Sequence, residues 1–329
     1  MKPYYPQLDQ LKGLAILLMV MAHTLSWSCP DYSSLSGCLR GMPPEIFNTA
    51  FLLKIIYSFH MHLLFFVSGF LLYKLGVKFD NLTVKKQLVK RASRLLVPYL
   101  STGMFVFFLR GYFGYWFFMV LFILDAIALC ELFVVEKAKI SDKTQLLSHF
   151  MVFLMIFILT RLFKNNIPQE LPQLSRLATY YLVFMFGFTM HKYSCIETFI
   201  MRPSIQLICF LIYVALMLVA NYWNLMGILS IVIPIFAISF LYNLFVNKKS
   251  KILGIIGKHS MEIYIFHLFF VMAFPEVGVY IMKQSNFPLS ITIQLSYSLF
   301  VSAIAIGFSI VIGAIVKSNK YLAKIILGV

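Results

Sequence analysis

About ten apolar stretches of membrane-spanning length follow one another along this chain. A helix needs about 20 mainly apolar residues to cross about 30 Å of hydrocarbon. On that scale the candidate spans cover residues 8–28, 52–73, 95–110, 115–135, 146–163, 176–191, 204–222, 225–246, 260–280 and 290–316. The composition agrees, because 61% of the residues are hydrophobic and only 12% are charged. We therefore predict an all-α fold, a polytopic bundle of about ten transmembrane helices that forms a single domain over residues 1–329.

Lysine and arginine are distributed unequally between the two sets of loops. If both termini are cytoplasmic, the inner segments hold most of the 28 basic residues, including the run between residues 74 and 94. Cytoplasmic loops of membrane proteins carry such an excess. We therefore predict two cytoplasmic termini and a multi-pass protein of the cell membrane, in contact with membrane lipid. The same bias accounts for the net charge of +16, so this charge indicates no nucleic-acid partner.

Two ionisable residues, Lys12 and His23, lie inside the first apolar stretch. At about 100° per residue they stand roughly three turns apart on one face of a helix. Ionisable groups inside a membrane are costly and usually face a bundle interior or a watery cavity. Asp9 precedes Lys12 by three residues and can pair with it. We interpret Lys12 as a cation near the inner end of a polar path, supported by Asp9, with His23 farther in. The alternative is a His bonded to a neighbouring helix and a Lys that reaches the membrane surface.

The second span contains two histidines, His60 and His62. They are about 200° apart around a helix, so both cannot face one cavity. We expect one to be buried and the other to be solvated near the interface, and the sequence does not decide which faces the cavity. Ser68 and Gly69 follow as a pair of small residues, a pattern that lets helices approach closely.

Arg91 and Arg94 are three residues apart and share one helical face at the start of the third span. That arrangement suits a phosphate-bearing ligand that approaches from the cytoplasm. Basic residues in this place also contact anionic lipid headgroups, and the sequence leaves both alternatives open.

In the ninth span, Ser260, Tyr264 and His267 follow an i, i+4, i+7 spacing that places them on a common face. Ser260 is also a candidate for the helix N-cap. His267 is a second imidazole inside a span, and it either lines a cavity or packs in the core.

The cysteines and acidic residues indicate no resident metal. We find no CxxC motif, no paired Cys and His spacing and no cluster of carboxylates. We therefore expect no metal site and no permanently bound cofactor. Cys29 and Cys38 share the first outer loop, where an oxidising compartment could join them, and this pairing stays open.

Together these segments resemble the acyltransferase 3 family of integral membrane acyltransferases, which modify sugars and glycans with acetyl or similar groups. Members typically begin with Leu-Asp-x-x-Arg-Gly and have a His farther along the same span. The corresponding segments here are Leu8-Asp9-Gln10-Leu11-Lys12-Gly13 with His23, the second-span motif from Phe59 to Phe70 with His60 on the motif His, Arg91-x-x-Arg94, the start of the fourth span at Tyr115-Trp116-Phe117, and Gly257 to His267. The resemblance covers nearly the whole chain, and the order and spacing of the motifs make it specific.

Two substitutions depart from the family pattern. Lys12 stands where many members carry Arg, so a bidentate grip on phosphate or carbonyl is not expected here. His62 replaces the usual Pro of the second-span motif. The chain also carries no esterase-like domain of the kind that larger members append, so we expect the membrane part alone to complete the transfer.

The resemblance implies a membrane O-acyltransferase that moves an acyl group, in most members acetyl, from acyl-CoA on the cytoplasmic side to a hydroxyl of a cell-surface or lipid-linked sugar. Acetyl-CoA is then a co-substrate. We assign the coenzyme to Lys12, Arg91 and Arg94, catalysis to His23 as general base together with His60, and the substrate to Ser68, Trp116, Tyr264 and His267. Direct transfer and an acetyl-His intermediate both remain open.

Two other functions fit the same polar residues. A proton-coupled transporter or flippase for a lipid-linked sugar or small acid would also need several spans and buried histidines. The sequence shows no inverted repeat to favour it. A membrane partner without catalysis could use the histidines to bond helices together.

Overall fold

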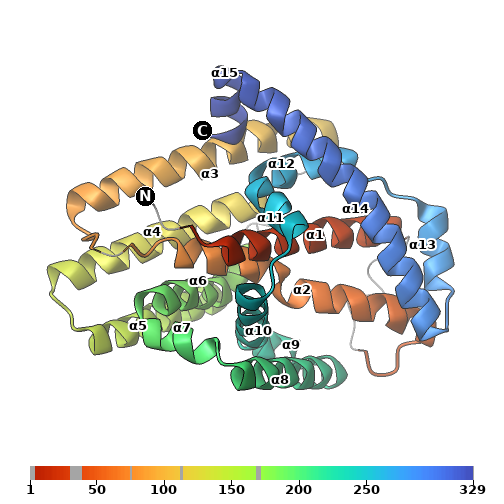
Figure 1. Cartoon of the computed structure of the whole chain (residues 1–329), viewed down its shortest axis with the longest axis horizontal. Coiled ribbons are helices and arrows are strands. Elements are labelled where there is room, and N and C mark those ends of the chain that lie inside the picture. The colour runs from red at the N-terminus through yellow and green to blue at the C-terminus, as the bar shows by residue number, and fades with distance from the viewer. Residues whose placement is uncertain (1–3, 30–38, 75, 112–113, 168–171, 329) are drawn as a thin grey trace. The chain divides into compact units, whose positions relative to one another are not determined.

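The computed structural model describes residues 4–29, 39–74, 76–111, 114–167 and 172–328, and all regular structure within these ranges is helical (Figure 1). The predicted all-α class is therefore confirmed. The chain divides into two compact units, one of residues 1–67 and 195–313 and the other of residues 68–194 and 314–329. One domain over the whole chain stays a prediction.

The first unit contains the N-terminal helices and most of the C-terminal half. Its elements are α1 (Pro6–Ser28), the greater part of α2 (Pro44–Phe70), α7 (Ser194–Ile200), α8 (Pro203–Tyr222), α9 (Met226–Leu229), α10 (Ile233–Asn247), α11 (Lys251–Lys258), α12 (Ser260–Phe270), α13 (Pro275–Met282) and α14 (Phe287–Ser318) as far as Gly313.

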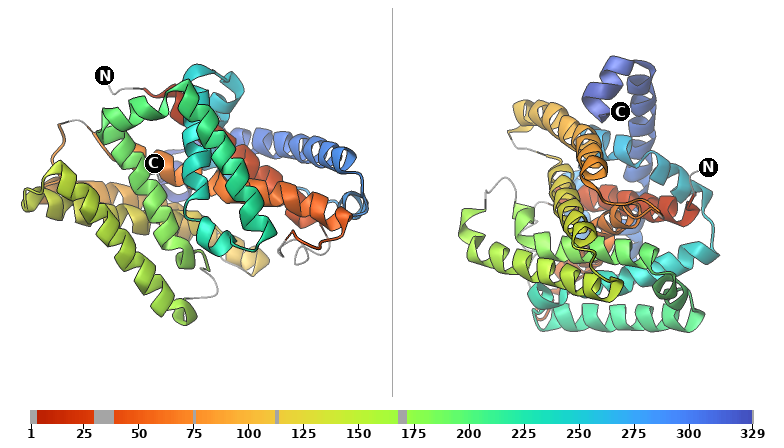
Figure 2. Two further views of the ribbon diagram at one scale, coloured as in Figure 1. Left: turned by 90° about the horizontal axis from the view of Figure 1, so that it is seen from below. Right: turned by 90° about the vertical axis from the view of Figure 1, so that its left-hand side faces the viewer.

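The second unit is built on the middle of the chain. Its elements are the end of α2, α3 (Asn81–Arg110), α4 (Trp116–Lys137), α5 (Asp142–Leu162), the 3₁₀ turns η2 (Lys164–Asn166) and η3 (Pro172–Arg176), α6 (Leu177–Lys192), the end of α14, α15 (Lys320–Leu322) and the π-helical turn η4 (Ala323–Leu327). Within this unit α3 lies along α4, and α5 lies along α6 (Figure 2).

Local sequence explains where several helices begin. The side chains of Asp80, Ser141 and Ser250 cap α3, α5 and α11 by accepting hydrogen bonds from backbone N–H groups. Hydrogen bonds from Thr83 lower the pKa of the exposed Asp80 carboxyl, so this cap stays ionised. Prolines in the first turn begin α1, α8, α10 and α13, where the missing N–H costs nothing.

In the first unit α1 packs closely on α11 (Figure 1). A Cβ atom added at Gly13 would lie 2.0 Å from the backbone oxygen of Leu253, and one at Gly257 would lie 1.8 Å from that of Asp9. Only glycine permits this approach of two backbones. The motif Leu8 to Gly13 is therefore a packing motif as well as a carrier of polar residues.

Gln10 on α1 makes hydrogen bonds to the backbone on both sides of the break between α10 and α11. Its buried side-chain amide donates to the backbone oxygen of Phe245 at 3.3 Å, and its oxygen accepts from the backbone nitrogen of Ser250 at 2.5 Å. Both backbone groups belong to helix ends, which have no partners within their own helices. The Gln10 side chain of α1 thus supplies hydrogen-bond partners to the end of α10 and the beginning of α11, and it helps to determine where α11 begins.

The ninth predicted span is a bent pair of helices. The axes of α12 and α13 differ by 95° across a break that ends at Pro275. Ser28 and Tyr297 supply oxygens to the backbone nitrogen of Phe274, at 3.2 and 3.3 Å. Ser260 is the first residue of α12 and not its N-cap, which is His259, because α11 ends at Lys258 and leaves one residue between the two helices.

Seven of the described helices are long and apolar enough to cross a membrane, and the bent pair is a possible eighth span. The seven are α1, α2, α3, α4, α5, α8 and α14. Two predicted spans, 176–191 and 225–246, correspond to shorter helices of 16 and 15 residues, α6 and α10. Fifteen residues rise only about 22 Å, less than the roughly 30 Å of hydrocarbon. The number of about ten spans is not confirmed, and the side on which the termini lie stays a prediction.

We expect Gly257→Ala to lower the stability of the protein, because its Cβ would overlap the α1 backbone. Overpacking of this kind typically costs about 1–3 kcal/mol. Gly254→Ala is the matched control, since it lies on the same helix and its Cβ would meet nothing within 4 Å. Thermal unfolding of the detergent-purified variants should show a lower Tm for Gly257→Ala alone. Equal values for the two variants would contradict the close packing of α1 on α11.

Candidate functional site

Two histidines far apart in the sequence meet in the first unit. His23 on α1 and His267 on α12 are 244 positions apart, and 3.0 Å separates Nδ1 of His23 from Nε2 of His267. His267 is 1% exposed, whereas His23 is only half-buried. The sequence predicted both as site residues but did not predict their contact. His267, assigned above to the substrate, has its Nε2 directed at His23.

The backbone of α12 determines which nitrogen atoms carry hydrogen. Nδ1 of His267 lies 2.9 Å from the carbonyl oxygen of Tyr264 and 3.0 Å from that of Ile263. A carbonyl oxygen only accepts, so Nδ1 of His267 carries the hydrogen and Nε2 of the neutral ring is an acceptor. His23 must then donate from its Nδ1. The unprotonated lone pair of His23 is left on Nε2.

Nε2 of His23 makes no hydrogen bond to any residue that the structure describes. Trp27, one turn farther along α1, stacks on the His23 ring with 5.3 Å between the ring centroids. The ring is thus held by Trp27 on its face and by His267 at Nδ1. A held imidazole with a lone pair on Nε2 can accept a proton from a bound hydroxyl.

Both histidines of α2 are buried, His60 at 4% exposed and His62 at 6%. The expectation that one of them is solvated is therefore wrong, because helices of the bundle cover more than one face of α2. Nδ1 of His60 lies 2.8 Å from the carbonyl oxygen of Ile56 and must donate to it. The neutral His60 ring consequently presents an acceptor at Nε2 and could donate there only when protonated.

The predicted pair of Asp9 and Lys12 is confirmed, with 2.7 Å between the carboxylate oxygen and Nζ. Both side chains are largely covered, at 13% and 25% exposed. Tyr264, on the same helix as His267, is buried, and its ring centroid lies 6.1 Å from that of His267. These residues and the histidines belong to one unit, and Arg91, Arg94, Ser68 and Trp116 belong to the other.

The two arginines of the predicted phosphate site have different environments in the second unit. Nη1 of Arg91 lies 2.8 Å from a carboxylate oxygen of Asp125, whose side chain is fully buried on α4. Arg94 is exposed. Arg91 thus pairs with a buried carboxylate through Nη1, a contact that the sequence analysis did not predict. The signal was present, because a carboxylate within an apolar span indicates a partner.

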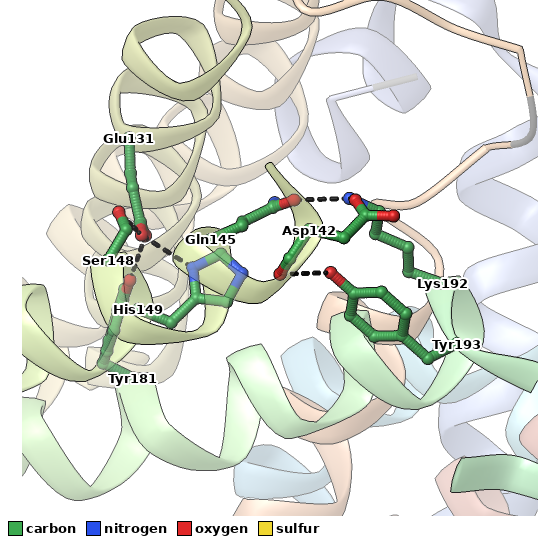
Figure 3. A network of polar contacts seen from close by, with 8 residues as sticks. All are labelled: Glu131, Asp142, Gln145, Ser148, His149, Tyr181, Lys192 and Tyr193. Carbon is green, nitrogen blue, oxygen red and sulfur yellow. Dashed lines mark hydrogen bonds and ion pairs between the residues drawn. The ribbon is translucent and has the colours of Figure 1, made fainter. Parts of the chain in front are cut away.

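A second buried carboxylate, Glu131 on α4, gathers three side chains (Figure 3). One oxygen accepts from Ser148 Oγ and from His149 Nδ1, both at 2.6 Å, and the other accepts from the hydroxyl of Tyr181. These bonds join α4 to α5 and α6. This network was also missed, although Glu131 lies within the predicted span 115–135.

Lys192 closes a neighbouring network at the end of α6 (Figure 3). Its ammonium donates to Asp142 at 2.7 Å and to the side chain of Gln145, and the hydroxyl of Tyr193 donates to the Asp142 carbonyl oxygen at 3.2 Å. Partial burial acts to lower the pKa of Lys192, but the hydrogen bond to Asp142 and the charges of Tyr193 and Asp142 outweigh it. The pKa is therefore raised, and the ammonium stays charged.

The remaining predicted residues have mainly packing contacts. Trp116 stacks on Tyr180 with 6.0 Å between centroids, and Ser68 is half-buried. Gly69 lies against the backbone of Phe184, where a Cβ would come within 1.8 Å of the oxygen, so the predicted close packing at this pair is confirmed for Gly69. Among the described residues no cluster of three His, Cys, Asp or Glu could hold a metal. Cys29 is a buried free thiol, and Cys38 lies outside the described residues.

A known family matches nearly the whole chain. Its model, described as an acyltransferase domain, covers residues 5–317. No curated protein and no solved structure matches the chain significantly. The matched range includes every predicted site residue in both units, and together with the apolar helices it identifies a multi-pass membrane protein.

We expect Arg91→Ala to destabilise the protein strongly, because it leaves the Asp125 carboxylate buried without its partner. Removing one member of a buried ion pair typically costs about 3–5 kcal/mol. Asp125→Asn in the same chain should restore much of the loss, and the exposed Arg94→Ala should change stability little. Denaturant unfolding in detergent measures all three. If Arg94→Ala and Arg91→Ala were equally stable, the ion pair would carry no structural role.

Proposed function

The chain belongs to the acyltransferase 3 family of membrane acyltransferases, and we propose that it transfers an acyl group from acyl-CoA to a hydroxyl group of a sugar, with His23 as general base. The observation that carries the proposal is the bond between His23 Nδ1 and His267 Nε2. It leaves Nε2 of His23 unprotonated. A general base needs this state before the acceptor hydroxyl can attack.

The reaction requires one proton to move twice through His23. Nε2 accepts the hydroxyl proton as the alcohol oxygen attacks the thioester carbonyl carbon. The carbon–sulfur bond then breaks, and the leaving thiolate takes the proton from Nε2. The products are an ester and free coenzyme A, and His23 returns to its neutral form. An acetyl-His intermediate on the same nitrogen is the alternative route.

His267 acts in this scheme as a positioning residue. When His23 is an imidazolium, its Nδ1–H donates to the neutral Nε2 of His267, and a charge-assisted hydrogen bond is the stronger kind. The bonds from His267 Nδ1 to the α12 carbonyls hold that ring in the required tautomer. The partner of the histidine in hydrolase triads has the same task of orientation.

We assign the donor to the cytoplasmic side. Coenzyme A is polyanionic and cannot cross hydrocarbon, so its phosphates need cations at the inner surface. Arg94 is exposed and suits that role, and Lys12 with Asp9 lies on the same helix as His23, on the expected path of the thioester arm. Arg91 stays assigned to the coenzyme phosphates as well; Asp125 takes one hydrogen bond from its Nη1, and the guanidinium has further N–H donors.

The acceptor is expected to be a cell-surface or lipid-linked sugar in the bacterial cytoplasmic membrane, and acetyl is the expected acyl group. Ser68, Trp116 and Tyr264 remain assigned to substrate, and His60 to the reacting groups. Because Nδ1 of His60 is bonded to the Ile56 carbonyl, His60 would stabilise a developing oxyanion only as an imidazolium.

We expect His23→Ala to abolish acyl transfer while the protein still inserts and purifies intact. General-base assistance typically contributes about 10²- to 10⁴-fold, and a loss in this range is expected in kcat. The measurement is transfer or hydrolysis of label from radiolabelled acetyl-CoA by the purified variant. Normal turnover would remove His23 from the mechanism, and a wild-type protein that left the thioester intact would favour a carrier.

Substitution of His267 distinguishes orientation from mere packing. His267→Gln offers a side-chain oxygen that can accept from His23 Nδ1, whereas His267→Leu offers none. We expect the Gln variant to keep more activity than the Leu variant, with kcat lowered and donor KM little changed in both. Equal kcat values in two variants of equal Tm would show that the hydrogen bond to His23 is not used.

A further inference from the structure

A cleft with a cavity volume of about 420 Å³ lies in the second unit, at the ends of α2, α4 and α6 and the beginning of α5. Small-molecule sites typically have volumes of about 300–1,000 Å³. The wall includes Tyr73, Phe79 and Phe188 as aromatic members, and Gln145 as a polar one. None of the residues assigned to acyl transfer above lines this cleft.

Three lysines and two carboxylates supply the charge of the cleft. Lys74, Lys139 and Lys192 line it, together with Glu136 and Asp142. Lys192 is held at 2.7 Å by Asp142, so its ammonium is fixed in place. Cations therefore exceed anions by one in the lining, and Glu136 adds an acceptor for a hydroxyl or amino group.

The walls are joined to one another. Glu131 on α4 bonds to Ser148 and His149 on α5 and to Tyr181 on α6, and Lys192 bonds to Asp142 and Gln145 in the first turn of α5 (Figure 3). The helices that carry the lining are thus positioned without any ligand. Such preorganisation lowers the cost of ordering on binding.

Lys139 occupies a backbone position that normally selects glycine. α4 ends in a Schellman motif, in which the nitrogen of Ile140 donates to the oxygen of Val135 at 3.0 Å and that of Lys139 to the oxygen of Glu136 at 3.2 Å. Lys139 takes the left-handed conformation with φ 51°. A Cβ there is unfavourable, and residues held in such conformations cluster at functional sites.

We propose that this cleft binds a phosphate-bearing ligand, with the ammonium of Lys139 as the contact that the ligand uses and Lys74 and Lys192 as further cations. The alternative explanation for Lys139 is that helix C-termini favour a cation through the helix dipole. That effect acts within the last turn of the helix. Lys137 is in that turn and lies outside the cleft lining, with its Nζ 5.9 Å from the ring centroid of Phe133. Lys139 lies beyond the helix, in the conformation that a lysine disfavours.

The test compares three variants of the full-length protein in neutral detergent. Lys139→Gly removes the charge and relieves the backbone, so we expect its Tm to stay level or rise while affinity falls. Lys139→Arg keeps the charge and should keep affinity. Lys137→Gln is the control, because it removes a positive charge at the same end of α4 but outside the cleft. Its affinity for the probes should equal that of the wild type.

Two probes distinguish the sources of phosphate. Calorimetry measures the affinity for adenosine 3′,5′-bisphosphate in proteins that all carry Arg94→Ala, because this probe is the nucleotide part of coenzyme A and Arg94 is assigned to the coenzyme above. Native mass spectrometry measures retention of phosphatidylglycerol against phosphatidylcholine. If Lys139→Gly lowers the affinity for adenosine 3′,5′-bisphosphate about tenfold or more, the cleft binds a free phosphorylated molecule. If it lowers retention of phosphatidylglycerol by that factor instead, the cleft binds a lipid headgroup. Probes that bind equally to Lys139→Gly and wild type, or bind to neither, overturn the proposal.

This inference is independent of the proposed acyl transfer. It rests on the second unit alone, and neither probe requires turnover. A normal Lys139→Gly affinity would leave the role of His23 untouched, and an inactive His23→Ala protein should still bind the probe.

Discussion

Close contact between the backbones of α1 and α11 positions the polar residues of the first unit. Gly13 and Gly257 permit the approach, and Gln10 satisfies the backbone groups at the break before α11. Because a single residue, His259, separates α11 from α12, the place of α11 on α1 sets where α12 begins. His267, two turns into α12, then meets His23 on α1 at 3.0 Å. The family motif around Asp9 and Lys12 therefore also holds α11 and α12 in the position that brings His267 to His23.

The second unit obeys a constraint of the membrane interior, where an isolated charge is costly. Each buried carboxylate of α4 has partners from another helix. Asp125 has Arg91 of α3, and Glu131 has Ser148, His149 and Tyr181. These bonds give the unit a fixed frame, and the cleft at its end takes its shape from that frame. Arg91, which the sequence marks as a candidate for ligand binding, also neutralises the buried carboxylate of Asp125.

Sequence reasoning succeeded where the signal is local. Apolar stretches of sufficient length marked α1, α2, α3, α4, α5, α8 and α14, and the i, i+3 spacing marked the pair of Asp9 and Lys12. It failed where the signal depends on a partner from elsewhere in the chain. The bend before Pro275 and the burial of both His60 and His62 depend on the helices packed around them. The acidic residues Asp125 and Glu131 inside the predicted span 115–135 could have indicated these partners, because a buried carboxylate needs one.

The sequence by itself determined the all-α class and the family, and it marked His23 and His267 as candidate site residues, because hydrophobic length and motif spacing are properties of consecutive residues. The tertiary structure alone decided that His267 faces His23, and hence which nitrogen of His23 holds a free lone pair. That outcome depends on a hydrogen bond between residues 244 positions apart. No periodicity within either helix encodes it. Only the packing of α12 against α1 brings the two rings within reach.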